Sequence, residues 1–156
     1  MTFTPHVRRQ VSGRLTVAPE SKMIEVELLA GRSSPASGRV PPLEVVQRLC
    51  ASAAASVGID DGHLAIEFVD ERRIAELNGR YRERPRPTDV LSFPIDGAEP
   101  LGGERELGDV IICLEHTVDV REAIVHGVLH LLGMDHETDG GEMLTLQREL
   151  LAREPT

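Results

Sequence analysis

Residues 120–136 read VREAIVHGVLHLLGMDH, and after the first turn this stretch is apolar on almost every side. A helix that is hydrophobic all round is typical of a buried, central position. The polar interruptions in it are His126 and His130, and Gly133 supplies a residue at which such a helix ends. Thr117 is the expected N-cap. The stretch therefore predicts a central helix that carries two histidines.

Helix and strand patterns alternate on both sides of this helix. Strands are expected where apolar residues alternate or run together, at residues 22–29, 63–69, 90–93 and 107–114. Helices are expected at about residues 41–57, after Asp70 as a cap, and at 142–153, where Asp139 and Glu142 have the spacing of a capping box. The order predicts an α+β domain in which one small mixed sheet packs against helices.

The chain has 156 residues, which at roughly 100–200 residues per domain indicates a single domain. Residues 1–21 show no periodicity and are expected to form a mobile N-terminal extension, with the domain over 22–156. No stretch has the ~20 apolar residues of a membrane span and the start lacks a signal peptide, so a cytoplasmic protein is expected. Cys50 and Cys113 form no CxxC pair and are expected to be reduced core residues.

The charge is unevenly distributed along the chain. The net charge is −9, which by itself disfavours a nucleic-acid partner, but six arginines fall within residues 72–86. We interpret this segment as a strip that binds phosphates, with an ordinary solvated helix and loop as the alternative. Aromatic residues make up 3% of the chain and Trp is absent, so stacking of bases on aromatic platforms is not expected to dominate binding.

Three histidines have the spacing of a metal site. His126 and His130 are four residues apart, so on a helix their Cβ atoms lie about 5–6 Å apart on one face. Gly133 lets the chain turn back and bring His136 to the same point. Three imidazoles with an open fourth position are typical of catalytic zinc, and one zinc per chain is expected, although nickel and other late metals stay open. The alternative, three histidines satisfied within an apolar core, is costly without hydrogen bonds.

The spacing H-x-x-x-H-x-x-G-x-x-H is also that of metzincin proteases. Those enzymes carry a glutamate after the first histidine as the general base, and this chain has Gly127 there. A peptidase of that mechanism is therefore disfavoured. A glycine within a helix costs ~1 kcal/mol relative to alanine, and we interpret Gly127 as clearance over the metal for a bulky substrate.

Four motifs are informative in combination: HGVLHLLGMDH at 126–136, PTDVLSFP at 87–94, LNGRYR at 77–82 and LGDVIIC at 107–113. Together they resemble the YbeY family of bacterial ribosomal RNA maturation factors and endoribonucleases. The resemblance runs from about Met23 to the end of the chain. The segment between LGDVIIC and the first histidine is shorter than the resemblance leads one to expect.

The resemblance implies a zinc-binding fold with a central helix like that of zinc metalloproteases. It implies cleavage of single-stranded RNA rather than DNA, maturation of the 3′ end of 16S ribosomal RNA, ribosome quality control, and the small ribosomal subunit as partner. It also implies His126, His130 and His136 as metal ligands and Arg82 as a catalytic or phosphate-contacting residue.

The remaining polar residues of these motifs leave alternatives open. One role for these residues, Asp89, Ser92 and Asp109, is to orient the histidines through hydrogen bonds. The alternative is that each of them caps a strand or bonds the backbone. No side chain stands out as the general base. A zinc-stabilised ribosome assembly factor without catalytic activity is the alternative function.

Overall fold

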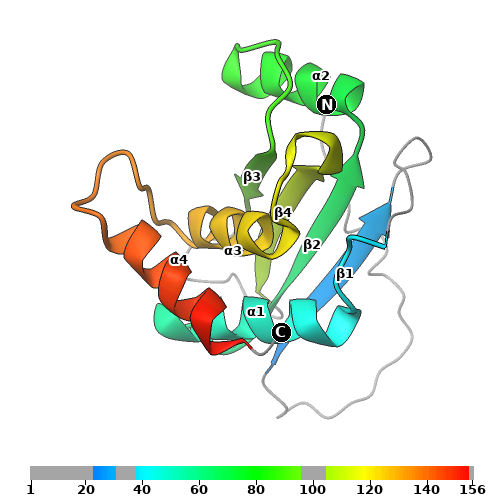
Figure 1. Cartoon of the computed structure of the whole chain (residues 1–156). Coiled ribbons are helices and arrows are strands. Elements are labelled where there is room, and N and C mark those ends of the chain that lie inside the picture. The colour runs from blue at the N-terminus through cyan, green and yellow to red at the C-terminus, as the bar shows by residue number, and fades with distance from the viewer. Residues whose placement is uncertain (1–22, 31–37, 96–104, 155–156) are drawn as a thin grey trace.

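A mixed sheet of four strands carries the fold within residues 23–30, 38–95 and 105–154, the part of the chain that the computed structural model describes. Its strands are β1 (Ile24–Ala30), β2 (Gly62–Val69), β3 (Val90–Pro94) and β4 (Glu106–Cys113). They lie in the order β1-β2-β4-β3, as Figure 1 shows. The pairs β1–β2 and β2–β4 are parallel and β3–β4 is antiparallel. The continuous apolar run of β4 is explained by its interior position.

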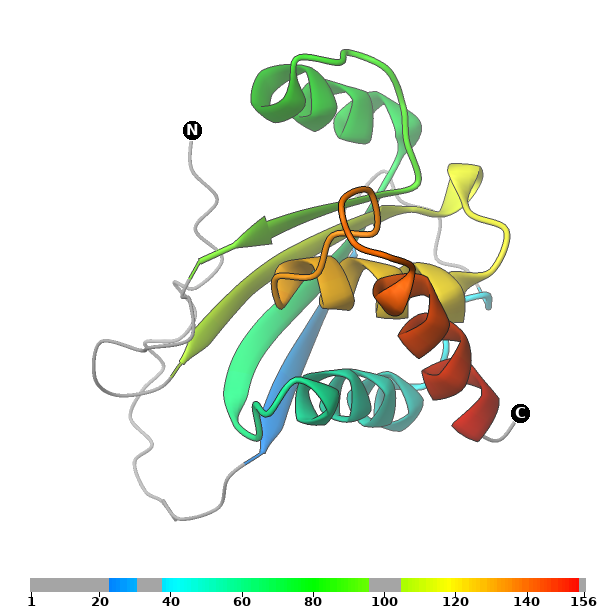
Figure 2. The same ribbon diagram turned by 90° about the vertical axis from the view of Figure 1, so that its left-hand side faces the viewer.

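Helices cover both faces of this sheet. They are α1 (Leu43–Ser56), α2 (Glu71–Arg82), α3 (Val120–Leu131) and α4 (Glu142–Arg153), with a short 3₁₀ turn, η2 (Leu114–His116), after β4. Figure 2 shows α1, α3 and α4 together on one face and α2 alone on the other. The predicted α+β class with a small mixed sheet is confirmed.

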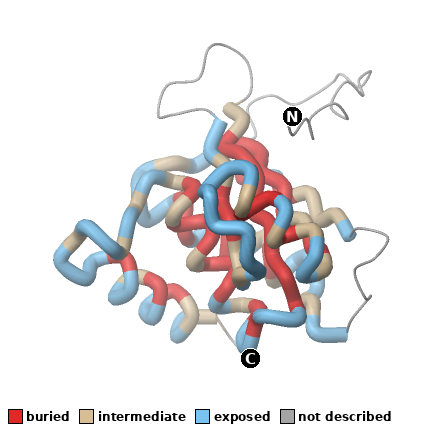
Figure 3. The backbone as a smooth tube through the Cα atoms, turned by 90° about the horizontal axis from the view of Figure 1, so that it is seen from above, coloured by how far each residue is buried: buried red, intermediate tan, exposed pale blue. Residues whose placement is uncertain are grey.

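The central position predicted for the histidine-bearing helix is also confirmed. Helix α3 packs against α1, α4, β3 and β4 at once, and most of its side chains are buried. Figure 3 shows the buried residues concentrated in the middle of the molecule, with exposed residues around them. A smaller cluster that includes Ile74, Leu77 and Ile111 holds α2 against the opposite face of the sheet.

Two predicted helix starts differ from the structure. The N-cap of α3 is Asp119, whose side chain accepts from the Glu122 backbone N–H at 3.2 Å. Thr117 instead donates its hydroxyl to the Cys113 carbonyl, because η2 is inserted before the helix. The N-cap of α4 is not Asp139.

Both side chains predicted to cap α4, those of Asp139 and Glu142, bond backbone N–H groups at its start, but Asp139 is not the N-cap residue. Gly141 is the N-cap, at φ 104°. Asp139 lies two residues earlier and accepts from the backbone N–H groups of Gly141 and Met143. Glu142 reaches back to the Gly140 N–H at 2.7 Å. Asp139 and Glu142 therefore cap the helix across a loop in which Gly141 adopts a left-handed conformation. The capping-box spacing alone does not reveal this glycine.

Both cysteines are free and buried, as predicted. Burial raises the pKa of the Cys50 thiol to about 12, so this cysteine stays protonated. No helix in the described part of the chain has the length and apolar character needed to cross a bilayer. The extension predicted over residues 1–21 lies outside the described residues.

Candidate metal centre

The three predicted ligands come together at the end of α3. His126 and His130 stand one turn apart on this helix, and Gly133, at φ 103°, ends it and turns the chain back toward His136. One ring nitrogen from each histidine lies within 4.8 Å of the other two. The ring centroids are 4.8 to 5.1 Å apart. The spacing of the histidines in the sequence therefore predicted their convergence correctly.

Two of the rings are oriented by hydrogen bonds. The Nδ1 atom of His126 lies 2.8 Å from Oε1 of Gln147, on α4. The Nδ1 atom of His130 lies 3.0 Å from the carbonyl oxygen of Met134. An Nδ1–H that donates to an oxygen leaves Nε2 as the lone-pair nitrogen, the arrangement typical of metal-bound histidines. The protein therefore presents Nε2 of both rings to the shared point.

Gln147 was missed by the sequence analysis. It lies 21 residues from His126 in sequence, and a contact between two helices leaves no spacing rule. A signal was present in the helix pattern. Gln147 falls on the buried face of α4 between Met143 and Leu150, and a buried amide at a core position needs a hydrogen-bond partner.

The site fits a divalent metal that prefers nitrogen ligands. Within the described residues, Nδ1 of His136 is buried without a hydrogen-bond partner, a costly state for a polar atom that would be relieved if this nitrogen coordinated a cation. Burial, reinforced by the neighbouring His126, lowers the pKa of His130. Neutral imidazole is the form that binds metals. These observations favour zinc or a similar late metal over magnesium or calcium.

Arg82 shares a cavity with the three histidines. The cavity measures about 450 Å³, and its other walls are the start and the exposed edge of β3 together with Glu137. Arg82, the last residue of α2, donates from Nη2 to the Ser92 carbonyl at 3.1 Å. This bond holds an exposed guanidinium at the rim of the histidine site. The structure therefore brings the predicted phosphate-contacting residue to the predicted metal ligands.

Two of the residues considered as orienters of the histidines bond the backbone instead. Asp89 accepts from the Val90 N–H at 2.9 Å, at the start of β3. The Ser92 hydroxyl donates to the Gly127 carbonyl at 2.7 Å and ties β3 to α3. Asp109 is buried in β4 opposite Phe93, and its role toward the histidines stays a prediction.

The interpretation of Gly127 as clearance over the metal is wrong. A Cβ at this position would lie 2.6 Å from Cγ1 of Val110 and 2.9 Å from Cγ2 of Val90. Gly127 therefore faces the sheet and permits the close approach of α3 to β4 and β3. The same contacts leave no room for the glutamate that metzincins carry there.

The arginine segment occupies the end of α2 and the loop that follows. Asn78 donates to the Arg86 carbonyl at 2.9 Å and fixes this loop against the helix. Within the described residues, Arg80, Arg84 and Arg86 have no carboxylate within ion-pair distance, whereas Arg73 pairs with Glu76 and is less available. Guanidinium groups without a carboxylate partner among the described residues therefore lie on both sides of Arg82 in the sequence, at the end of α2 and in the loop that follows.

Comparison with known proteins agrees with this geometry. The sequence model of the family described as endoribonuclease YbeY matches residues 42–154. The chain is 38% identical over 109 residues to the endoribonuclease YbeY of Aquifex aeolicus, covering 62% of this chain and 71% of that protein. It is 37% identical over 131 residues to that of Bacillus cytotoxicus, covering 70% and 84%.

A solution structure of a Thermotoga maritima protein aligns with a TM-score of 0.45 and 25% identity, covering 81% of this chain and 86% of that one. The family match spans most of the chain and includes the three histidines and Arg82. The chain belongs to the endoribonuclease YbeY family.

Proposed function

We propose that this chain is a zinc-dependent endoribonuclease that cleaves single-stranded RNA in the cytoplasm. Its expected substrate is the 3′ region of 16S ribosomal RNA on the small subunit, in maturation and in ribosome quality control. We further propose that residues 22–156 form the functional domain. The observation that carries the proposal is the cavity in which three convergent imidazoles meet an exposed arginine. Membership of the family supports it.

The chain's own residues supply binding and charge at this cavity. His126, His130 and His136 would hold one metal ion, which would act as a Lewis acid toward a phosphodiester and activate water. The planar guanidinium of Arg82 matches two phosphate oxygens and neutralises charge that develops on them. Because Arg82 is anchored to the Ser92 carbonyl, it reaches the phosphate already oriented.

The arginine segment would bind the RNA backbone beyond the cut site. An acidic protein repels RNA over most of its surface, so binding depends on this local strip and weakens as salt rises. Arg72, exposed on the first turn of α2, lies far along the helix from Arg82. Its loss should reduce affinity and the salt dependence of binding rather than the rate of cleavage.

The test combines metal analysis with single-turnover cleavage of single-stranded ribosomal RNA. We expect about one zinc per chain and cleavage that Arg82→Ala greatly reduces without loss of metal. Arg148→Ala, which removes an exposed arginine from α4, is the matched control and should cleave normally. Metal-loaded wild-type protein that binds ribosomal RNA or the small subunit without cutting would instead indicate the zinc-stabilised assembly factor.

A further inference from the structure

A second cavity of about 320 Å³ adjoins the metal cavity. His126 and Asp89 line both, so the two cavities meet along α3. The walls of the second cavity come from the turn between β4 and α3, from the first turns of α3 and from α4.

The second cavity is acidic, whereas the metal cavity holds Arg82 beside the carboxylates of Asp89 and Glu137. Asp89, Asp119 and Glu122 line the second cavity, and no lysine or arginine is among its described lining residues. Asp119 uses one carboxylate oxygen to cap α3, and Glu122 has a 3.5 Å contact from Gln147 to one of its oxygens. The second oxygen of each carboxylate remains available to a ligand. Such a surface repels a phosphate and accepts hydrogen bonds from N–H donors.

Apolar surface and a ring complete the cavity. Val118 is 97% exposed and Leu144 37% exposed, so aliphatic surface stands in water at this rim. His116 is a further lining residue, and its ring nitrogen Nε2 lies 3.1 Å from Oε1 of Glu71. Unstacked bases of single-stranded RNA bind on apolar and aromatic side chains and are read on their Watson–Crick edges.

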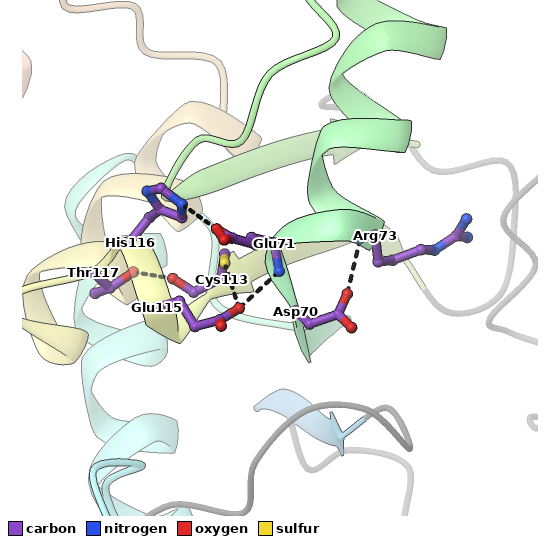
Figure 4. Close-up of polar contacts among 7 residues, drawn as sticks. All are labelled: Asp70, Glu71, Arg73, Cys113, Glu115, His116 and Thr117. Carbon is purple, nitrogen blue, oxygen red and sulfur yellow. Dashed lines mark hydrogen bonds and ion pairs between the residues drawn. The ribbon is translucent and has the colours of Figure 1, made fainter.

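The turn that forms this wall is held rigidly from both sides. The Arg39 guanidinium donates to the carbonyl of Leu114 at 2.8 Å and to that of Thr117. Figure 4 shows His116 directed at Glu71, the first residue of α2, with a separation of 3.1 Å. A subsite whose wall is fixed before binding loses little entropy when it is filled.

We propose that this cavity binds one nucleobase of the RNA, beside the nucleotide whose phosphate lies at the metal centre, and that it prefers guanine. The proposal rests on the RNA cleavage proposed above. Guanine presents adjacent N1–H and N2–H₂ donors that match the two oxygens of one carboxylate, and an oxygen that already accepts one hydrogen bond keeps a second lone pair for this contact. Cytosine and adenine offer one amino group each, and uracil places carbonyl oxygens on both sides of its single N–H.

The test measures binding apart from cleavage. Fluorescence anisotropy would give the dissociation constants of 2′-O-methyl heptamers, which lack the free 2′-hydroxyl, for U₇ and for the same strand with G, C or A at the central position. We expect the central G to tighten binding by about fivefold or more, the low end for a bidentate base contact. Single-turnover cleavage of the matching RNA strands should show the same order.

Glu122→Gln keeps the size of the side chain and removes one carboxylate, so it should reduce the G:U ratio toward one with unchanged zinc content. Glu149→Gln, an equal charge change at an exposed position on α4 outside the cavity, should leave the ratio intact. Tighter binding of every strand by Glu122→Gln with an unchanged ratio would overturn the proposal, because it would reflect net charge alone. Equal binding of all strands by wild type would overturn it while RNA cleavage stands, and absence of both binding and cleavage would overturn both proposals.

Discussion

Gly127→Ala tests whether α3 is positioned by its close contact with the sheet. The new methyl group would lie 2.6 Å from Val110 and 2.9 Å from Val90, and both neighbours are β-branched strand residues whose side chains have few alternative rotamers. Overpacking of this kind costs about 1–3 kcal/mol. The helix gains ~1 kcal/mol when alanine replaces glycine. We expect packing to win because two clashes arise at one atom.

The expected net loss is about 1–2 kcal/mol in the free energy of unfolding, or roughly 2–8 °C in melting temperature for a protein of this size. Urea denaturation of the metal-free protein measures it without a contribution from metal binding. Gly38→Ala, at a site with nothing within 4 Å of the new Cβ, is the control and should change stability little.

A second substitution identifies the cause of the loss. Val110→Ala opens space at the closest contact, so the double variant Gly127→Ala/Val110→Ala should be more stable than the sum of the single effects by roughly 0.5–3 kcal/mol. If Gly127→Ala were as stable as wild type or more stable, the packing argument would fail. Lost cleavage with unchanged stability would instead support clearance for substrate.

Three further predictions concern the metal site and the domain boundary. His130→Ala should lose its bound metal by elemental analysis and melt at the temperature of chelator-treated wild type, since metal binding is coupled to folding; retained metal would contradict the assignment. In metal-free protein, burial lowers the pKa of His130 from 6.5. The unfolded chain therefore binds more protons than the folded one, and the free energy of unfolding should fall as the pH drops below about 6.5. Denaturation between pH 5 and 8 should show this slope, and His130→Gln should reduce it. Removal of residues 1–21 should leave melting temperature and metal content unchanged, and a large drop in either would place part of the domain in that segment.

The convergence of the three histidines could be predicted from sequence because their geometry is local. A four-residue helical spacing fixes His126 and His130 on one face, and a single glycine with positive φ returns the chain to His136. Neither requirement depends on how the rest of the chain folds. The same locality made the order of helices and strands readable.

The interpretations that failed depend on contacts between distant elements. Gly127 looks like clearance in the sequence, but Val110 and Val90 on two strands give its reason. The start of α3 shifted from Thr117 to Asp119 because a 3₁₀ turn precedes it. Arg39 donates to carbonyls of that turn from 75 or more residues away, and no local pattern reveals such a contact.

Arg82 is the one arginine or lysine among the described residues that line the two adjoining cavities, and it shares the metal cavity with the carboxylates of Asp89 and Glu137. His126 belongs to both cavities, with Arg82 in one and the carboxylates of Asp119 and Glu122 in the other. A uniformly basic groove would hold a polyanion in many registers with similar affinity. In the proposed mode of binding, Arg82 attracts phosphate at one cavity and the carboxylates of the second cavity repel it, which restricts the register because a base and not a phosphate occupies the acidic position. We therefore expect RNA to bind in one register at the histidine site, through one cationic contact placed beside a cavity that excludes phosphate.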